Sequence, residues 1–182
     1  MQSDKIKKYT AKEFLESSDE SKEHSELWYG EIIDFAAPNE VHQTIVLGVA
    51  SELRSFIKAK GGSCKPFAAP FDVVLGDDTV VQPDVMVICD PDKLDGKRCN
   101  GAPDLTVEVV SGDRKADFSV KLEMYKNSGV REYWIIDPES EKVLIYTFDD
   151  KKVKGLEFYS FDTPIPVGIF DGALKLVINE II

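Results

Sequence analysis

Apolar residues between residues 41 and 57 recur at spacings of three and four, and this spacing predicts an amphipathic helix. Asn39 is placed to cap the first turn of this helix, and Gly61 and Gly62 are placed to end it. The apolar positions are Val41, Ile45, Val46, Val49, Leu53, Phe56 and Ile57. One side of the helix is therefore expected to pack against a sheet.

Two further helices are predicted from their end signals. Thr10 and Glu13 form a capping-box pattern at the start of the segment AKEFLESS, which predicts a short helix there. Another helix is expected from about residue 115 to residue 128, where Gly129 ends it.

The strands are predicted from runs of β-branched and aromatic residues that are separated by glycine or proline. One hairpin is expected to turn at Gly30, and a second is expected to turn within the segment DDKKVKG. The remaining expected strands cover residues 66–75, 84–89, 104–110 and 131–137.

The order of these elements indicates the class of fold. The strand at 104–110, the helix that follows it and the strand at 131–137 form one β-α-β unit, whose two strands should be parallel with a right-handed crossover. We expect a single domain over residues 1–182 of the α/β (α+β) class, with a mixed central sheet flanked by helices.

Composition narrows the class of protein. The 182 residues are 43% hydrophobic and 30% charged, which is typical of a globular domain. The chain has no apolar run of roughly 20 residues, the length of a membrane span, and its first residues lack the apolar segment of a signal peptide. We therefore expect a cytoplasmic protein with no membrane partner.

The three cysteines predict no disulfide framework. Cys64, Cys89 and Cys99 are odd in number and form no C-x-x-C pair, so reduced thiols are expected. A zinc site made from them with His24 or His42 is disfavoured, because no pair of ligands has zinc-finger spacing.

The net charge of -11 opposes binding to a phosphate backbone, since nucleic-acid-binding proteins usually carry a basic surface. The charge is unevenly distributed, however. Residues 93–131 contain eight basic and six acidic side chains, so this stretch is +2 and the rest of the chain is -13. The central third is therefore the only part of the chain that suits a polyanion.

Glu108 raises the main chemical question, because it lies in the middle of an otherwise apolar strand. A buried carboxylate without a partner costs several kcal/mol or becomes neutral. Asp84 follows Pro83 at the start of another strand, and the two carboxylates can meet if these strands are neighbours. A divalent cation such as Mg²⁺ would relieve their repulsion and could activate a water molecule.

The helix after the Glu108 strand supplies a candidate amine. Asp117, Lys121 and Tyr125 are spaced four apart and share one face of this helix. Lys121 can lean over the strand ends toward Glu108, where a lysine would orient the attacking water or offset charge in the transition state.

Several segments of the chain resemble one bacterial family. They are QPDVMVICDPDKLDGKRCNGAPDLTVEVVS and KLEMYKNSGVREYWIIDPE in the centre, with weaker likeness in YTAKEFLE, YGEIIDFAAPNEVHQ and GIFDGALKLVI. The family is Uma, a group of restriction-endonuclease-like proteins in the PD-(D/E)XK nuclease superfamily. The resemblance implies a restriction-endonuclease-like core with additional β-hairpins. It also implies a homodimer that hydrolyses DNA phosphodiester bonds with Mg²⁺ or Mn²⁺.

The superfamily motif carries over residue by residue. Asp84 matches its first aspartate and Glu108 its second acidic residue, and both would hold the metal together with the backbone carbonyl of Val109. The expected lysine position holds Val110 instead. In the resembling family the lysine lies on the following helix, where Lys121 matches it.

The motif lysine and one additional acidic residue have more than one candidate. Lys115 and Lys126 are the other candidates for the motif lysine. The superfamily often adds an acidic or amide residue from the first core helix or its approach, and Glu31 is our choice as an additional catalytic residue. His42 and Gln43 are the next candidates.

Each candidate also has a purely structural interpretation. Glu108 and Lys121 can form an ion pair without a metal, Asp84 can be an ordinary residue at the start of a strand, and Lys121 can form a solvated pair with Asp117. Two functional alternatives follow. One is a domain that binds or assembles without cutting DNA, which the net charge favours, and the other is a domain that hydrolyses a smaller phosphoester.

Overall fold

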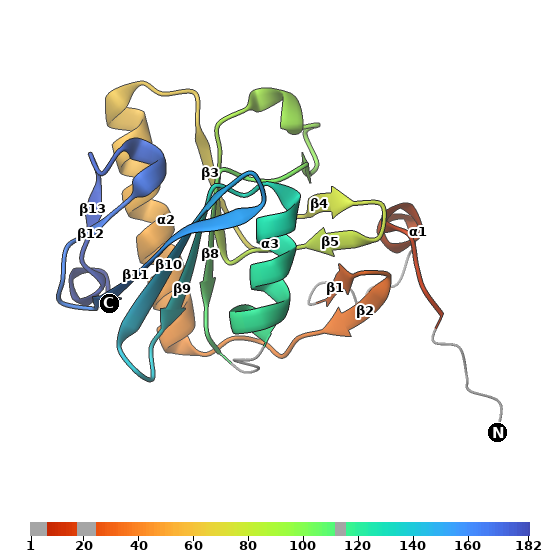
Figure 1. Ribbon diagram of the computed structural model, residues 1–182, viewed down its shortest axis with the longest axis horizontal. Helices are drawn as coiled ribbons and strands as arrows, with labels where there is room; N and C mark the ends of the chain where they lie inside the picture. The colour runs from red at the N-terminus through yellow and green to blue at the C-terminus, as the bar shows by residue number, and fades with distance from the viewer. Residues whose placement is uncertain (1–6, 18–24, 112–115) are drawn as a thin grey trace.

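A computed structural model of the chain describes residues 7–17, 25–111 and 116–182. Its centre is a six-stranded mixed sheet with the strand order β11-β10-β9-β8-β6-β3. These strands are β3 (Lys65–Ala68), β6 (Val85–Ile88), β8 (Leu105–Val109), β9 (Glu132–Asp137), β10 (Lys142–Asp149) and β11 (Lys152–Ser160). Helices α2 (Glu40–Lys60) and α3 (Leu122–Ser128) lie on opposite sides of this sheet (Figure 1).

A second, smaller sheet has the strand order β2-β1-β5-β4-β7 and lies on the α3 side of the molecule (Figure 1). Its strands are β1 (Ser25–Trp28), β2 (Glu31–Asp34), β4 (Val73–Gly76), β5 (Thr79–Val81) and β7 (Cys99–Asn100). Helix α1 (Ala11–Glu16) packs against it, because Phe14 and Leu27 belong to one buried cluster. Strands β12 (Ile165–Pro166) and β13 (Lys175–Leu176) pair separately.

The predicted mixed sheet flanked by helices is confirmed, together with the ends of its main helix. The Asn39 side chain accepts a hydrogen bond from the His42 N–H at the start of α2, and Gly61 ends the helix in the left-handed conformation (φ 67°). Ile45, Val49 and Leu53 are fully buried against the large sheet, as their spacing predicts. No helix among the described residues is long and apolar enough to cross a membrane.

The predicted β-α-β unit is also confirmed. Strands β8 and β9 are parallel neighbours, and the chain between them contains a π-helical turn (Ala116–Lys121) that leads directly into α3. Gly129 ends α3 with a φ of 97°. The lysine candidate Lys115, at the expected start of this helix, lies outside the described residues.

The strand expected over residues 66–75 was predicted wrongly as one element. It is two strands in different sheets, since β3 pairs with β6 in the large sheet and β4 pairs with β5 in the small one. Pro70 lies between them and has no N–H to donate to a ladder, so the chain leaves one sheet there and enters the other.

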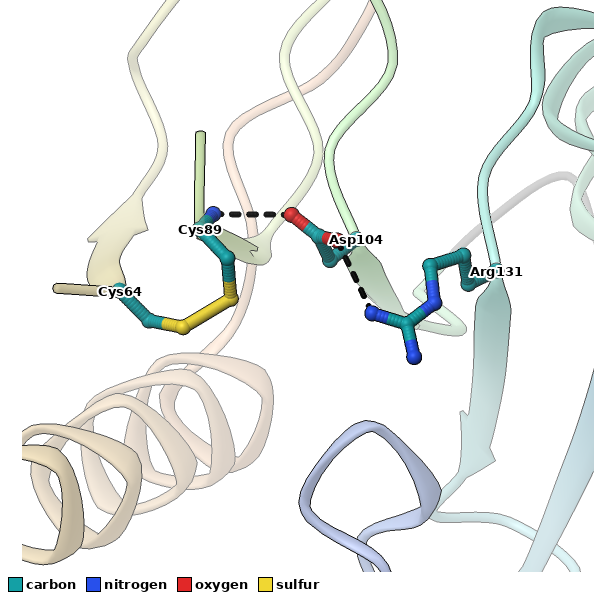
Figure 2. Close-up of a disulfide and its surroundings, with 4 residues drawn as sticks. All are labelled: Cys64, Cys89, Asp104 and Arg131. Carbon is teal, nitrogen blue, oxygen red and sulfur yellow. Dashed lines mark hydrogen bonds and ion pairs between the residues drawn. A yellow bond between two sulfur atoms is a disulfide. The ribbon is translucent and has the colours of Figure 1, made fainter. Parts of the chain in front are cut away.

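The prediction of reduced thiols was wrong for two of the three cysteines. Cys64 and Cys89 form a disulfide (Figure 2). Cys99 is free and buried. Lys65 pairs with Ile88 in the antiparallel β3–β6 ladder, so the two cysteines are the next residues facing each other. An odd number of cysteines leaves one unpaired, but it does not prevent the other two from pairing across a ladder.

Loss of the Cys64–Cys89 disulfide is expected to lower the free energy of unfolding by about 3 kcal/mol, because it closes a loop of 25 residues in the unfolded chain. The measurement is chemical denaturation of the wild type and the Cys64→Ser/Cys89→Ser double variant without reductant. Dithiothreitol should lower the stability of the wild type by a similar amount and leave that of the variant unchanged. Equal stabilities without reductant would contradict the disulfide.

Candidate functional site

Glu108 lies in the middle of β8 with only 3% of its surface exposed. Its Oε1 atom lies 2.9 Å from the Lys121 Nζ and accepts a 2.5 Å hydrogen bond from the Tyr125 hydroxyl. Both partners come from the helical segment after β8, where a four-residue spacing places them on the side that faces the strand. The distance between these two side chains confirms the prediction that Lys121 reaches Glu108.

The Lys121 amine lies among three carboxylates. Besides Glu108, it lies 3.7 Å from the Glu26 Oε1 and 3.9 Å from the Asp117 Oδ1. The aromatic rings of Trp28 and Phe35 lie 5.9 Å and 5.5 Å from the amine, within the range of a cation–π interaction. Lys121 is the last residue of the π-helical turn, a feature that often occurs at functional sites.

Asp84 is brought to this site by the pairing of β6 with β8. Val85 faces Val107 in this antiparallel ladder, so Asp84 lies level with Glu108 at the start of β6. The Asp84 Oδ2 accepts a 2.7 Å hydrogen bond from the Val109 N–H and lies 3.1 Å from the His42 Nε2. The structure thus brings together two strand-borne carboxylates, as the sequence predicts.

Burial and neighbouring charges shift the pKa values of Glu108 and Lys121. Burial raises the pKa of Glu108 well above its usual value, although the Lys121 amine opposes the shift. The carboxylates of Asp84, Asp117 and Glu26 raise the pKa of Glu108 further. Burial alone would lower the pKa of Lys121, but Glu108 and the other carboxylates raise it. Glu108 and Lys121 therefore stabilise each other's charged form.

Glu26 is the residue of this site that sequence analysis missed. It is 4% exposed in β1, and its Oε1 accepts the Gln82 N–H at 2.7 Å while its Oε2 accepts the Trp28 indole N–H at 2.6 Å. The only sequence signal was an acidic residue in an apolar strand, the same signal that pointed to Glu108. Glu26 thus links the small sheet to Lys121 and to the segment that leads to Asp84.

The other candidates lie outside this site. Glu31, our additional catalytic candidate, is exposed on β2 opposite Trp28, and among the described residues it bonds to neither Lys121 nor Glu108. Gln43 is exposed on α2, and Lys126 pairs with Glu123 on α3. The additional acidic residue beside the lysine is therefore Glu26 in the structure, on the strand before the one that carries Glu31.

Five side chains form a carboxylate–lysine cluster, which consists of Glu26, Asp84, Glu108, Asp117 and Lys121. Two oxygens of this cluster, Asp84 Oδ1 and Glu108 Oε2, accept no hydrogen bond from the described residues. Mg²⁺ commonly binds one or two carboxylates and keeps several waters, so these oxygens fit such an ion. No group of three or more metal-ligating side chains occurs within the described ranges.

Asp84 has the most exposed side chain of the cluster. It keeps 18% of its surface exposed, whereas the side chains of Glu108 and Lys121 keep 4% and 7%. A cavity of about 390 Å³ lies beyond the end of β8, where Val110 and Ser111 line it, and no residue of the cluster lines this cavity. A ligand that enters the cluster would therefore meet Asp84 before Glu108.

Comparison with known proteins gives two matches. The family model described as "Uma2: Putative restriction endonuclease" matches residues 11–176. A crystal structure of a putative nuclease belonging to DUF820 from Anabaena variabilis ATCC 29413 is similar, with a TM-score of 0.78 and 24% sequence identity. The similarity covers 95% of this chain and 97% of that chain, and it shows a shared fold. No curated protein matches the chain.

Proposed function

The chain belongs to the Uma2 family, described as putative restriction endonucleases, and from this premise we propose that it is a metal-dependent endonuclease that hydrolyses DNA phosphodiester bonds. One observation carries the proposal. Asp84 and Glu108, 24 residues apart in the sequence, lie level on neighbouring strands, and the Lys121 amine lies 2.9 Å from Glu108. A carboxylate pair can hold a divalent ion that activates water for phosphodiester hydrolysis, and an adjacent amine can offset the charge that develops in the transition state.

Each residue of the cluster has a distinct role in this proposal. Asp84, Glu108 and the Val109 carbonyl would hold Mg²⁺ or Mn²⁺, which would activate a water molecule and stabilise charge on a phosphoryl oxygen. Lys121 stays protonated, because the surrounding carboxylates raise its pKa, and it positions the attacking water. The Tyr125 hydroxyl donates a hydrogen bond to Glu108 and fixes the rotamer of that carboxylate.

Glu26 supports the amine rather than the metal in this proposal. Both of its oxygens accept hydrogen bonds, from Gln82 and Trp28, so its own position is fixed. At 3.7 Å it attracts the Lys121 ammonium group from β1 of the small sheet. Its charge therefore keeps Lys121 protonated and extended beside Glu108.

The alternative is a nuclease-like domain that binds or assembles without cutting DNA. The net charge of -11 supports it, since a protein that neutralises DNA phosphates is usually basic. In that case the Glu108–Lys121 contact is a structural ion pair.

The test is incubation of the purified chain with supercoiled plasmid DNA and Mg²⁺ or Mn²⁺, with EDTA as the control. Nicked or linear product that disappears with EDTA is the expected result. Absence of cleavage together with Mn²⁺ binding in calorimetry would point to a smaller phosphoester as substrate. Absence of both in a folded chain would support the binding or assembly module.

A homodimer is part of the proposal, because the family resemblance implies one and two copies of the chain would place two sites for the two strands of a duplex. Sedimentation of the purified chain is the direct measurement, and an expected mass of twice 20.3 kDa would support it. A monomer that only nicks plasmid DNA would remove the dimer from the proposal and leave the chemistry of the site in place.

The affinity for Mn²⁺ is expected to increase with pH, because metal ligands must be deprotonated and burial raises the pKa of Glu108. Below the raised pKa of Glu108, the binding constant should rise by up to about tenfold per pH unit, since one proton is released on binding. Above that pKa it should level off. Calorimetry from about pH 5 to about pH 8 measures this, and a flat affinity across the range would contradict it.

A further inference from the structure

His42 occupies a fixed position in the first turn of α2. Its backbone N–H donates to the Asn39 Oδ1 at 2.9 Å, which is the cap of this helix. Only 5% of the residue is exposed, although the next residue along the helix, Gln43, is exposed. The imidazole ring is therefore held at a defined place beside Asp84, at the start of β6.

The imidazole contacts one oxygen of Asp84. The Asp84 Oδ2 accepts the Val109 N–H at 2.7 Å and lies 3.1 Å from the His42 Nε2. An ionised carboxylate only accepts hydrogen bonds, so His42 must carry a proton on Nε2 to make this contact. Two donors, one from β8 and one from α2, thus fix Oδ2 and leave Oδ1 without a partner among the described residues.

The other ring nitrogen of His42, Nδ1, lowers the stability of the fold. The His42 Nδ1 is buried and has no hydrogen-bond partner among the described residues. A buried polar atom without a partner costs free energy, so an apolar side chain of similar size would stabilise the fold more. Among the described residues, the hydrogen bond to Asp84 is the one interaction of this ring that an apolar side chain could not replace.

From these contacts, we propose that His42 is a positioning residue, whose Nε2–H holds the Asp84 carboxylate so that Oδ1 faces the metal ion. This inference rests on the proposed metal-dependent function. Hydrogen bonds from a neighbouring group to a ligating carboxylate commonly change metal affinity by about 10- to 100-fold. His42 itself contacts neither the ion nor the substrate in this assignment.

The test compares Mn²⁺ binding by calorimetry to the full-length wild type and to the variants His42→Ala and His42→Gln. The affinity of His42→Ala should fall by about 10- to 100-fold. The affinity of His42→Gln should stay within about threefold of the wild type, because the Gln amide can donate to the same oxygen. Thr44→Ala is the matched control, since it removes a side-chain hydrogen bond to the Glu40 carbonyl in the same part of α2 but no contact to Asp84, and its affinity should be unchanged.

The outcomes separate this inference from the proposed function. If the wild type binds no Mn²⁺, the proposed function and the His42 assignment both fail. If the wild type binds and His42→Ala binds equally well, only the His42 assignment fails. Equal weakening in His42→Gln and His42→Ala, or in the control Thr44→Ala, would also overturn the assignment, because loss of packing or of local helix stability would then explain the effect.

A measurement on the wild type covers the case in which the alanine variant does not fold. Nitrogen-15 spectra of the imidazole report which ring nitrogen carries the proton. We expect a proton on Nε2 with and without Mg²⁺. A neutral ring protonated on Nδ1 could not donate to Asp84, and that result would overturn the assignment without any variant.

Discussion

Replacement of Asp84 by Asn is expected to abolish measurable Mn²⁺ binding and to slow cleavage of plasmid DNA by about 10³-fold or more. A bound divalent ion contributes several kcal/mol to stabilising the transition state, and each 1.36 kcal/mol corresponds to about tenfold in rate. Asn keeps the size of the side chain but removes the negative charge that an ion requires. It also presents either an amide or a carbonyl to the Val109 N–H, which now donates to the Asp84 carboxylate.

The matched control for this variant is Glu31→Gln. It removes the same charge from an exposed carboxylate of β2, outside the carboxylate–lysine cluster. Its cleavage rate should stay within about threefold of the wild type, because an exposed charge interacts weakly with the site through water. A loss of activity in Glu31→Gln equal to that in Asp84→Asn would return Glu31 to the catalytic site. Equal activities of Asp84→Asn and the wild type would remove the catalytic proposal.

Replacement of Lys121 by Met should destabilise the protein by about 3–5 kcal/mol, which is the usual effect of removing one partner from a buried ion pair. The variant leaves Glu108, Glu26 and Asp117 near one another without the cation between them. For a domain of this size, the midpoint of thermal unfolding should fall by roughly 6–20 °C. Differential scanning calorimetry and urea denaturation measure the two quantities.

Two further variants separate the sources of this loss. Lys126→Met removes a surface lysine that pairs with Glu123, and it should change stability by less than about 1 kcal/mol. The double variant Lys121→Met/Glu108→Gln should recover part of the stability lost in Lys121→Met, because it also removes the buried charge. It should not recover cleavage. Full recovery of cleavage in the double variant would show that the pair has no catalytic role.

The destabilisation of Lys121→Met should depend on pH. The pKa of Glu108 is raised above its ordinary value of 4.5, so the stability that its neutral form contributes is present below that value and is lost as pH rises through the raised pKa. Without the amine, the pKa of Glu108 rises further and this loss grows. The stability difference between variant and wild type should therefore be smaller near pH 5 than near pH 7.

The local elements of this fold could be predicted from the sequence. Helix α2 has a continuous apolar face, a capping Asn39 and a terminal Gly61, and each of these signals acts within a few residues of the chain. The same holds for the β-α-β unit and for the hairpin at Gly30. The period of two along β8 also places Glu108 on the face opposite Val107.

Part of the site followed from these local patterns. The motif residues Asp84 and Glu108 lie in strands that the sequence predicts, and Lys121 lies on the predicted helix that joins β8 to β9. The chain connects the last two directly, so the crossover limits where Lys121 can go. The adjacency of β6 and β8 was only a condition in the sequence argument, and the ladder between them fulfils it.

The remaining features depend on which distant segments become neighbours, and hydrophobic patterns do not encode this choice. The small sheet brings Glu26 to Lys121, the α2–β6 contact brings His42 to Asp84, and the β3–β6 ladder brings Cys64 to Cys89. A strand pattern specifies which face is buried but leaves the partner strand open. The sequence by itself therefore determined the elements and their core faces, and only the tertiary structure decided which buried charges and thiols meet.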